Sequence, residues 1–98
     1  MALQIDEALT LPPTGEPEKW ERHSTTVALP ENARYIHTIA SFECLLHGKE
    51  DVNEGVTGHW FRFIAATWDQ QKNTVRCECG YQVHDKQSTV VFHVHYRE

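Results

Sequence analysis

The sequence has no run of eighteen apolar residues, so it contains no segment long enough to cross a membrane as a helix. Residues 1–11 lack both a basic segment and a long apolar segment, and we therefore predict no secretory signal. Basic side chains are fewer than acidic ones. The chain has nine Lys and Arg and fourteen Asp and Glu, which gives a formal net charge of −5. Phosphate contact needs clustered Lys and Arg, so we expect neither a nucleic-acid nor a membrane partner.

Motifs that carry catalysis are absent as well. We find no Ser/His/Asp or Cys/His arrangement at a nucleophile elbow and no glycine-rich phosphate loop. The three cysteines are an odd number, which without an export signal indicates a reducing, cytoplasmic location. Cys77 and Cys79 also lack the CxxC spacing of a zinc knuckle, and between Val75 and Tyr81 they are expected to pack as small core residues.

The length of 98 residues fits one domain with a modest core. Residues 1–18 contain three prolines and a glycine without sustained periodicity, and this composition predicts a flexible N-terminal leader. Residues 19–98 are predicted to form a single β-rich domain. Within it, 20–29 is a candidate strand, and Pro30-Glu31-Asn32 fits either a hairpin loop with a left-handed Asn or the start of a helix.

The C-terminal residues alternate between apolar and polar side chains, which predicts β-strands at 74–85 and 88–96. A tight turn at Lys86-Gln87 would pair them as a hairpin, because alternate side chains of paired strands share a face. One face would be apolar: Val75, Cys77, Cys79, Tyr81, Val83, Val90, Phe92, Val94 and Tyr96. The other face would carry Arg76, Glu78, Gly80, Gln82, His84, Val91, His93, His95 and Arg97.

A third strand is predicted at 59–69, where both alternating rows are apolar. A turn at 70–73 would pair Trp68 with Val75, Ala66 with Cys77, Ile64 with Cys79 and Trp60 with Val83. This register puts both tryptophans on the apolar face. It puts Phe61 and Phe63 on the face that carries the histidines.

Residues 33–47 match two templates. As a helix, the segment has an apolar stripe that ends before Gly48, and as a strand it has Ile36, Thr38, Ala40 and Phe42 on one face. Few charges and many aromatic or β-branched residues favour the strand. The predicted fold is therefore mainly β, an antiparallel meander of four to five strands that could curl into a small half-barrel. The alternative is an α+β fold, with one helix at about 31–47 packed on an antiparallel sheet.

The seven histidines are the compositional outlier. His93 and His95 lie two residues apart on one strand, so their side chains point the same way from backbones about 6.5–7 Å apart. The predicted register places Glu78 beside His95, and two histidines with a carboxylate can hold iron, zinc or manganese. His93, His95 and Glu78 are therefore a candidate divalent-metal site, although an exposed polar face needs no metal to explain it.

Two functions are compatible with this pattern. The first is a small non-enzymatic interaction protein whose binding surface is the sheet face of Phe61, Phe63, Val91, His93 and His95, with a protein partner or a second copy of itself as the ligand. The second is a small metal- or ligand-dependent enzyme centred on His93, His95 and Glu78. Small size and the lack of a catalytic motif favour the first, which needs no cofactor.

Overall fold

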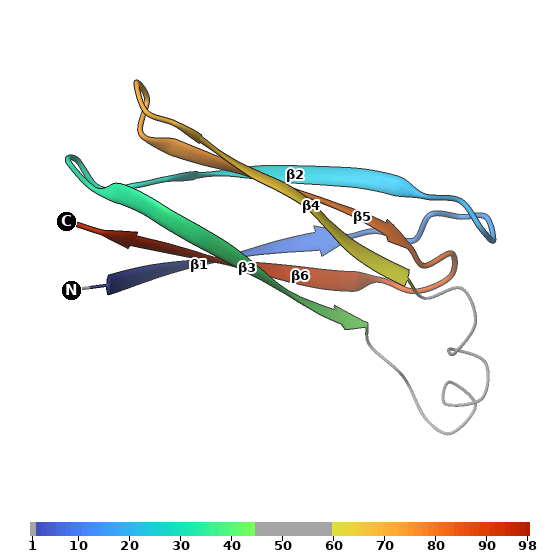
Figure 1. The fold of residues 1–98 in the computed structure, drawn as a ribbon. Coiled ribbons are helices and arrows are strands. Elements are labelled where there is room, and N and C mark those ends of the chain that lie inside the picture. The colour runs from blue at the N-terminus through green and yellow to red at the C-terminus, as the bar shows by residue number, and fades with distance from the viewer. Residues whose placement is uncertain (1, 45–59) are drawn as a thin grey trace.

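Residues 2–44 and 60–98 form an all-β structure of six antiparallel strands in two three-stranded sheets. The computed structural model describes residues 2–44 and 60–98 (Figure 1). The strands are β1 (Ala2–Leu11), β2 (Glu21–Ala28), β3 (Arg34–Cys44), β4 (Trp60–Asp69), β5 (Thr74–Gln82) and β6 (Ser88–Arg97). Sheet A has the order β1-β6-β3, and sheet B has the order β2-β5-β4. In the described part of the chain, no helix is long and apolar enough to cross a membrane.

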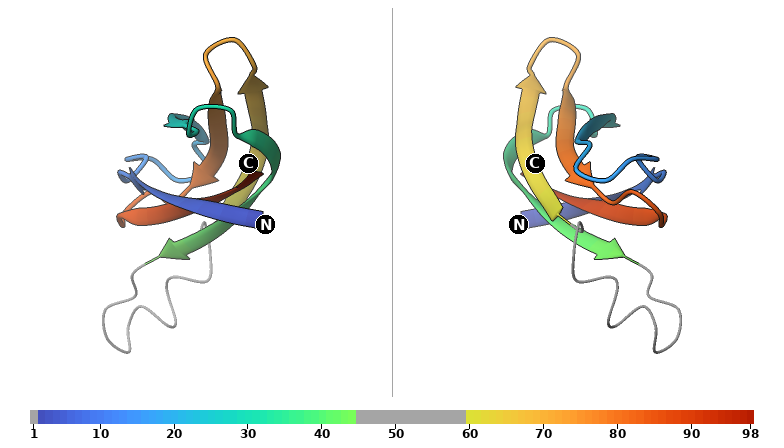
Figure 2. Two further views of the ribbon diagram at one scale, coloured as in Figure 1. Left: turned by 90° about the vertical axis from the view of Figure 1, so that its left-hand side faces the viewer. Right: turned by 90° about the vertical axis from the view of Figure 1, so that its right-hand side faces the viewer.

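The prediction of a mainly β fold is confirmed, but the predicted meander is wrong in two respects. The structure has six strands rather than four or five, and consecutive strands mostly lie in different sheets. Among the described strands, β4 and β5 are the one pair of consecutive strands that are also hydrogen-bonded neighbours. Their hairpin projects past the rest of the molecule (Figure 2). The described strands are arranged as two layers, and no closure into a half-barrel is observed.

The core lies between the two central strands, β5 and β6. The alternation rule identified its residues correctly, because the nine side chains of the predicted apolar face are all buried. The predicted pairing of these strands is wrong, since β5 belongs to sheet B and β6 to sheet A. Alternation fixes which side chains point inward, but the same two apolar rows can lie side by side or face each other across a sandwich.

The N-terminal segment is the largest correction to the sequence prediction. Residues expected to form a flexible leader instead form β1, which pairs with β6 along its whole length, from Ala2 opposite Arg97 to Leu11 opposite Ser88. Leu11 is fully buried, and Leu3, Ile5 and Leu9 pack against the core. The prolines that suggested a leader lie after the strand, where they belong to the connection to β2.

The segment at 33–47 is a strand where it is described, since β3 runs from Arg34 to Cys44. The α+β alternative is therefore wrong for this part of the chain. Asn32 has a φ of 67°, which confirms the left-handed loop residue, but the loop joins β2 of sheet B to β3 of sheet A and is no hairpin. The end of the segment at 33–47 and the beginning of the strand expected at 59–69 lie outside the described residues.

Two β-bulges change which side chains face outward. On β4 the predicted register holds for Trp68 opposite Val75 and Ala66 opposite Cys77, and it then shifts at Ile64. Beyond the shift, Phe63 lies opposite Cys79, and Trp60 lies opposite Gln82. The extra residue of the bulge reverses the alternation, so the phenylalanines turn toward the core and Trp60 turns outward. A similar shift on β3 falls between Tyr35 and His37.

One asparagine joins the two turns at the end of the molecule that holds the β4–β5 hairpin. Asn73 has a φ of 52°, and its side-chain NH2 donates to the carbonyl oxygens of Pro30 at 2.9 Å and Ala33 at 3.2 Å. Its side-chain oxygen accepts a hydrogen bond from the Trp68 indole at 2.9 Å. Asn73, Ala33 and Trp68 border a polar hollow of about 750 Å³. Because the polar groups of Asn73 already have partners within the chain, we interpret this end as structural.

Candidate functional site

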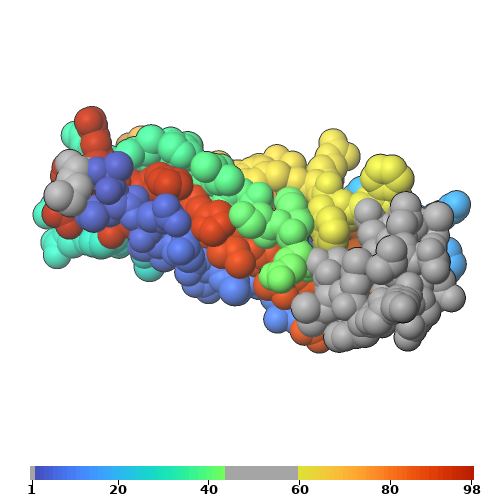
Figure 3. All heavy atoms as spheres, turned by 90° about the horizontal axis from the view of Figure 1, so that it is seen from below, coloured from blue at the N-terminus to red at the C-terminus, as the bar shows by residue number. Residues whose placement is uncertain are grey.

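The predicted histidine residues lie on the outer face of sheet A, on its central strand β6. Figure 3 shows this face, with β1 in blue, β6 in red and β3 in green lying side by side. We call it the histidine face and define it by its outward residues at the centre of the three strands. They are Gln4, Asp6 and Ala8 of β1, Val91, His93 and His95 of β6, and His37, Ile39 and Ser41 of β3.

A hydrogen-bonded row crosses this face from β1 to β3. Asp6 Oδ1 lies 2.8 Å from His93 Nδ1, and Ser41 Oγ lies 2.9 Å from His93 Nε2. An ionised carboxylate only accepts hydrogen bonds, so a neutral His93 carries its proton on Nδ1 and donates it to Asp6. His93 Nε2 is then free to accept the Ser41 hydroxyl hydrogen. The hydrogen bonds of Gln4 and His93 to Asp6 hold the pKa of that carboxyl below its usual value.

A second pair of side chains lies two residues along β6 from His93. His37 of β3 is directly opposite His95 of β6, and their rings stack with centroids 4.5 Å apart. Stacking directs the ring faces toward each other. The ring nitrogens, which bind metals in the plane of the ring, therefore do not converge on a common point.

The structure separates the predicted binding residues into two groups. Val91, His93 and His95 share the histidine face, whereas Phe61 and Phe63 lie on β4 of the other sheet and pack against the core. The Phe61 ring stacks on Phe42 at a centroid distance of 5.1 Å, and the Phe63 ring meets Phe92 edge-on at 6.1 Å. The expectation that all five share one face is wrong because the bulge at Ile64 turns the two phenylalanines inward.

The predicted metal ligands are separated as well. Glu78 lies on β5 and points outward from sheet B, where it approaches Arg76 at 3.6 Å. His93 and His95 point outward from sheet A, so the whole core lies between them and Glu78. Within residues 2–44 and 60–98, no group of three His, Cys, Asp or Glu side chains is arranged to hold a metal ion.

The row Asp6–His93–Ser41 has the connectivity of a serine-hydrolase triad, which sequence reasoning missed because Asp6 lay in the expected leader. Connectivity alone does not make a catalyst, since such enzymes also need donors aimed at a developing oxyanion and a site that excludes water. Ser41 lies on an open sheet face opposite Val91, whose side chain has no donor, and Asp6 is exposed. We therefore interpret the row as cross-strand hydrogen bonding that orders the histidine face.

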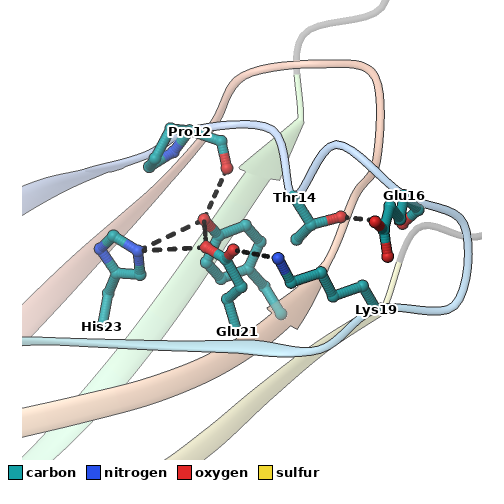
Figure 4. Close-up of polar contacts among 7 residues, drawn as sticks. Pro12, Thr14, Glu16, Lys19, Glu21 and His23 are labelled. Carbon is teal, nitrogen blue, oxygen red and sulfur yellow. Dashed lines mark hydrogen bonds and ion pairs between the residues drawn. The ribbon is translucent and has the colours of Figure 1, made fainter.

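The polar cluster around Tyr81 has a structural explanation too. Its hydroxyl donates to the Pro12 carbonyl oxygen at 2.5 Å, with Glu21 Oε2 at 3.4 Å and His23 Nε2 at 3.5 Å (Figure 4). Burial and the nearby charge of Glu21 raise the pKa of Tyr81 to about 12. A tyrosine base or nucleophile would need the opposite shift, so this hydroxyl fastens the β1–β2 connection to sheet B.

Cys77 and Cys79 are buried free thiols, as predicted for core residues. Burial, followed by the charge of Glu78, raises the pKa of Cys79 to about 11. The thiolate is the reactive form of cysteine, so this environment makes Cys79 inert at neutral pH. Neither thiol is placed for redox chemistry or metal binding in the described structure.

The raised pKa of Cys79 predicts a loss of stability at alkaline pH. The unfolded chain ionises this thiol near its ordinary value of 9.0, whereas the folded protein keeps it neutral until about pH 11. Below pH 9 the thiol is neutral in both states and the free energy of unfolding is unaffected. As the pH rises from 9 toward 11, ionisation of the thiol in the unfolded chain lowers the free energy of unfolding, by about 2–3 kcal/mol in total. Denaturant unfolding between pH 8 and 11 measures the fall, and Cys79→Ala, although less stable throughout, should fall less. Parallel curves would show that the thiol is not responsible.

Comparison with known proteins adds no assignment. No family model, no curated protein and no solved structure matches this chain.

Proposed function

We propose that this protein is a non-enzymatic interaction protein that binds through its histidine face, with a second copy of the chain as the partner. One observation carries the proposal. Ile39 is 52% exposed at the centre of β3, on a face where the neighbouring polar side chains already bond to one another. Monomeric proteins expose single apolar residues often, but Ile39 has Val91 and Ala8 on the same face.

The hydrogen bonds on the histidine face reduce the cost of covering it. Buried polar groups destabilise a complex when they lose water without gaining a partner. Asp6, His93 and Ser41 already bond in a row, and the His37 and His95 rings cover each other. A partner that lies over this face therefore strips little water from unpaired groups, while Ile39 and Val91 gain contact with apolar surface.

The size of the face sets the strength of the expected complex. The whole outer face of sheet A, which carries the histidine face at its centre, consists of three strands of about ten residues and covers about 33 Å by 15 Å, or roughly 500 Å² on each copy. A stable interface needs about 800 Å² per partner. We therefore expect a weak, concentration-dependent homodimer in which two histidine faces pack against each other.

Sedimentation of the wild type and of Ile39→Asp tests this function. The wild type should shift from monomer to dimer as its concentration rises, and Ile39→Asp should stay monomeric because it would bury a carboxylate. Thr67→Asp is the matched control, since it adds the same charge to the exposed outer side of sheet B and should dimerise like the wild type.

A wild type that stays monomeric at every concentration would contradict self-association. Equal loss of the dimer in Ile39→Asp and Thr67→Asp would contradict the histidine face as the contact, because one substitution lies on sheet A and the other on sheet B. In the first case the remaining partner for the histidine face is a different protein.

A further inference from the structure

The outer face of sheet B combines exposed tryptophans with arginines. Arg22 of β2 and Arg62 of β4 both lie directly opposite Gly80 on the central strand, so the three form one row across the sheet. Trp60 lies opposite Gln82, two residues along the same strand from Arg62. Trp20 is 50% exposed and Trp60 is 59% exposed, the largest aromatic surfaces that the described chain presents to solvent. We call this the tryptophan–arginine face.

Gly80 explains how Trp20 joins this face. A side chain placed at Gly80 would meet Ile64 Cδ1 at 3.4 Å and Trp20 Cε3 at 3.8 Å, so both side chains lie over the glycine. The Trp20 ring therefore lies on the sheet within the same row as the two arginines.

A hollow continues the same face toward the β4–β5 turn. It has a volume of about 480 Å³ and is lined by Thr26, Thr67, Asp69, Lys72, Thr74 and Arg76. Arg76 lies four residues from Gly80 on β5, or about 13 Å along the strand. Three threonine hydroxyls and Lys72 offer donors to a phosphate group. Arg76 would exchange its contacts with Glu78 at 3.6 Å and Ser24 Oγ at 3.3 Å for the phosphate.

The charge of this face is opposite to that of the whole protein. The face carries four cationic side chains and two carboxylates. The cations are Arg22, Arg62, Lys72 and Arg76, and the carboxylates are Glu78 and Asp69. Asp69 Oδ1 already accepts hydrogen bonds from the backbone N–H groups of Gln71 and Lys72. The expectation of no nucleic-acid partner was based on the net charge of −5, which is a sum over the whole chain and does not describe the potential over one sheet.

We propose that the tryptophan–arginine face binds a short single-stranded nucleic acid. Bases stack on Trp20 and Trp60, while Arg22, Arg62 and the hollow beside Arg76 contact successive phosphates. Aromatic platforms next to cationic side chains are the usual means of binding single strands without sequence preference. An acidic peptide would contact the arginines but not the tryptophans. A neutral glycan would stack on the tryptophans but would not need the arginines. The inference is independent of the histidine face, which lies on the opposite side of the molecule.

Fluorescence anisotropy of a labelled oligothymidylate, titrated with the full chain, tests the proposal. We expect binding at low salt, with log K falling against log salt with a slope of about −2, because about three phosphates are contacted and each contributes roughly 0.7. Trp60→Ala should weaken binding by about 5- to 100-fold, and Trp60→Phe should restore most of it. Arg62→Gln should weaken binding and flatten the salt slope, whereas Arg97→Gln, an exposed arginine of sheet A, should do neither.

Three results would overturn the proposal. The first is no binding of the oligothymidylate at low salt by a folded protein. The second is a pair of observations: Trp60→Ala binds as tightly as the wild type, and heparin displaces the oligothymidylate at equal charge concentration. Together they would show that the face binds any polyanion. The third is equal weakening by Arg62→Gln and Arg97→Gln, which would show that general charge is responsible. Circular dichroism of each variant confirms that it is folded.

Discussion

Removal of residues 2–11 should abolish the cooperative unfolding transition of this protein. The deletion takes away β1, which contributes the fully buried Leu11 and three partly buried apolar side chains. Burial of these groups stabilises the fold by roughly 5–8 kcal/mol, at about 1.5–3 kcal/mol for each fully buried side chain and less for the others. The total stability of a domain this size is about 5–15 kcal/mol. The truncated chain also leaves one edge of β6 without a partner.

Thermal unfolding followed by circular dichroism measures the effect of this deletion. A synthetic peptide of residues 1–11, added to the truncated chain, should restore the transition by pairing again with β6. A peptide of the same composition in scrambled order is the control and should not. If the truncated chain melts at the wild-type temperature, β1 contributes nothing to the fold.

Phe92→Ala should lower the free energy of unfolding by about 3–5 kcal/mol, the usual cost of removing a buried phenylalanine ring. Phe92 is fully buried at the centre of β6, and its ring packs edge-on against Phe63 across the two sheets. Val91→Ala is the matched control, because the adjacent residue points to the opposite, outer face. Its cost should stay below about 1 kcal/mol.

Urea denaturation of the two variants gives both values from midpoints at equal slope. Equal costs for Phe92→Ala and Val91→Ala would mean that β6 does not separate a core side from a solvent side. A larger cost for Val91→Ala would mean that the alternation is reversed and that the histidines point inward.

Sequence alternation predicted the inward side of β5 and β6 correctly, because the period of two in a strand depends only on backbone geometry. It could not predict which sheet each strand joins. Val83 and Val90 are equally buried as neighbours in one sheet or as opposite residues of two sheets, and the short connection between them permits either.

The candidate site was predicted in part for the same reason. Val91, His93 and His95 follow from alternation on β6. The strand reading of β3 named the inward row of Thr38, Ala40 and Phe42 correctly, but it included Ile36, which the shift beside it leaves exposed, and it did not name the outward row as part of the site. Two features of the site could not be predicted from the sequence. The bulge at Ile64 leaves no local signature in the sequence, and the pairing of Asp6 with His93 joins residues 87 positions apart.

The most direct test of the binding surface is modification of histidines by diethyl pyrocarbonate at neutral pH, at low and at high protein concentration. His37 and His95 should become protected as the concentration rises, because both lie on the histidine face. His23 of β2 and His84, after β5, lie outside this face and serve as internal controls whose rates should not change. Unchanged rates for all four histidines at concentrations far above the dimer range, or protection of His23 in place of His37 and His95, would contradict the proposed interface.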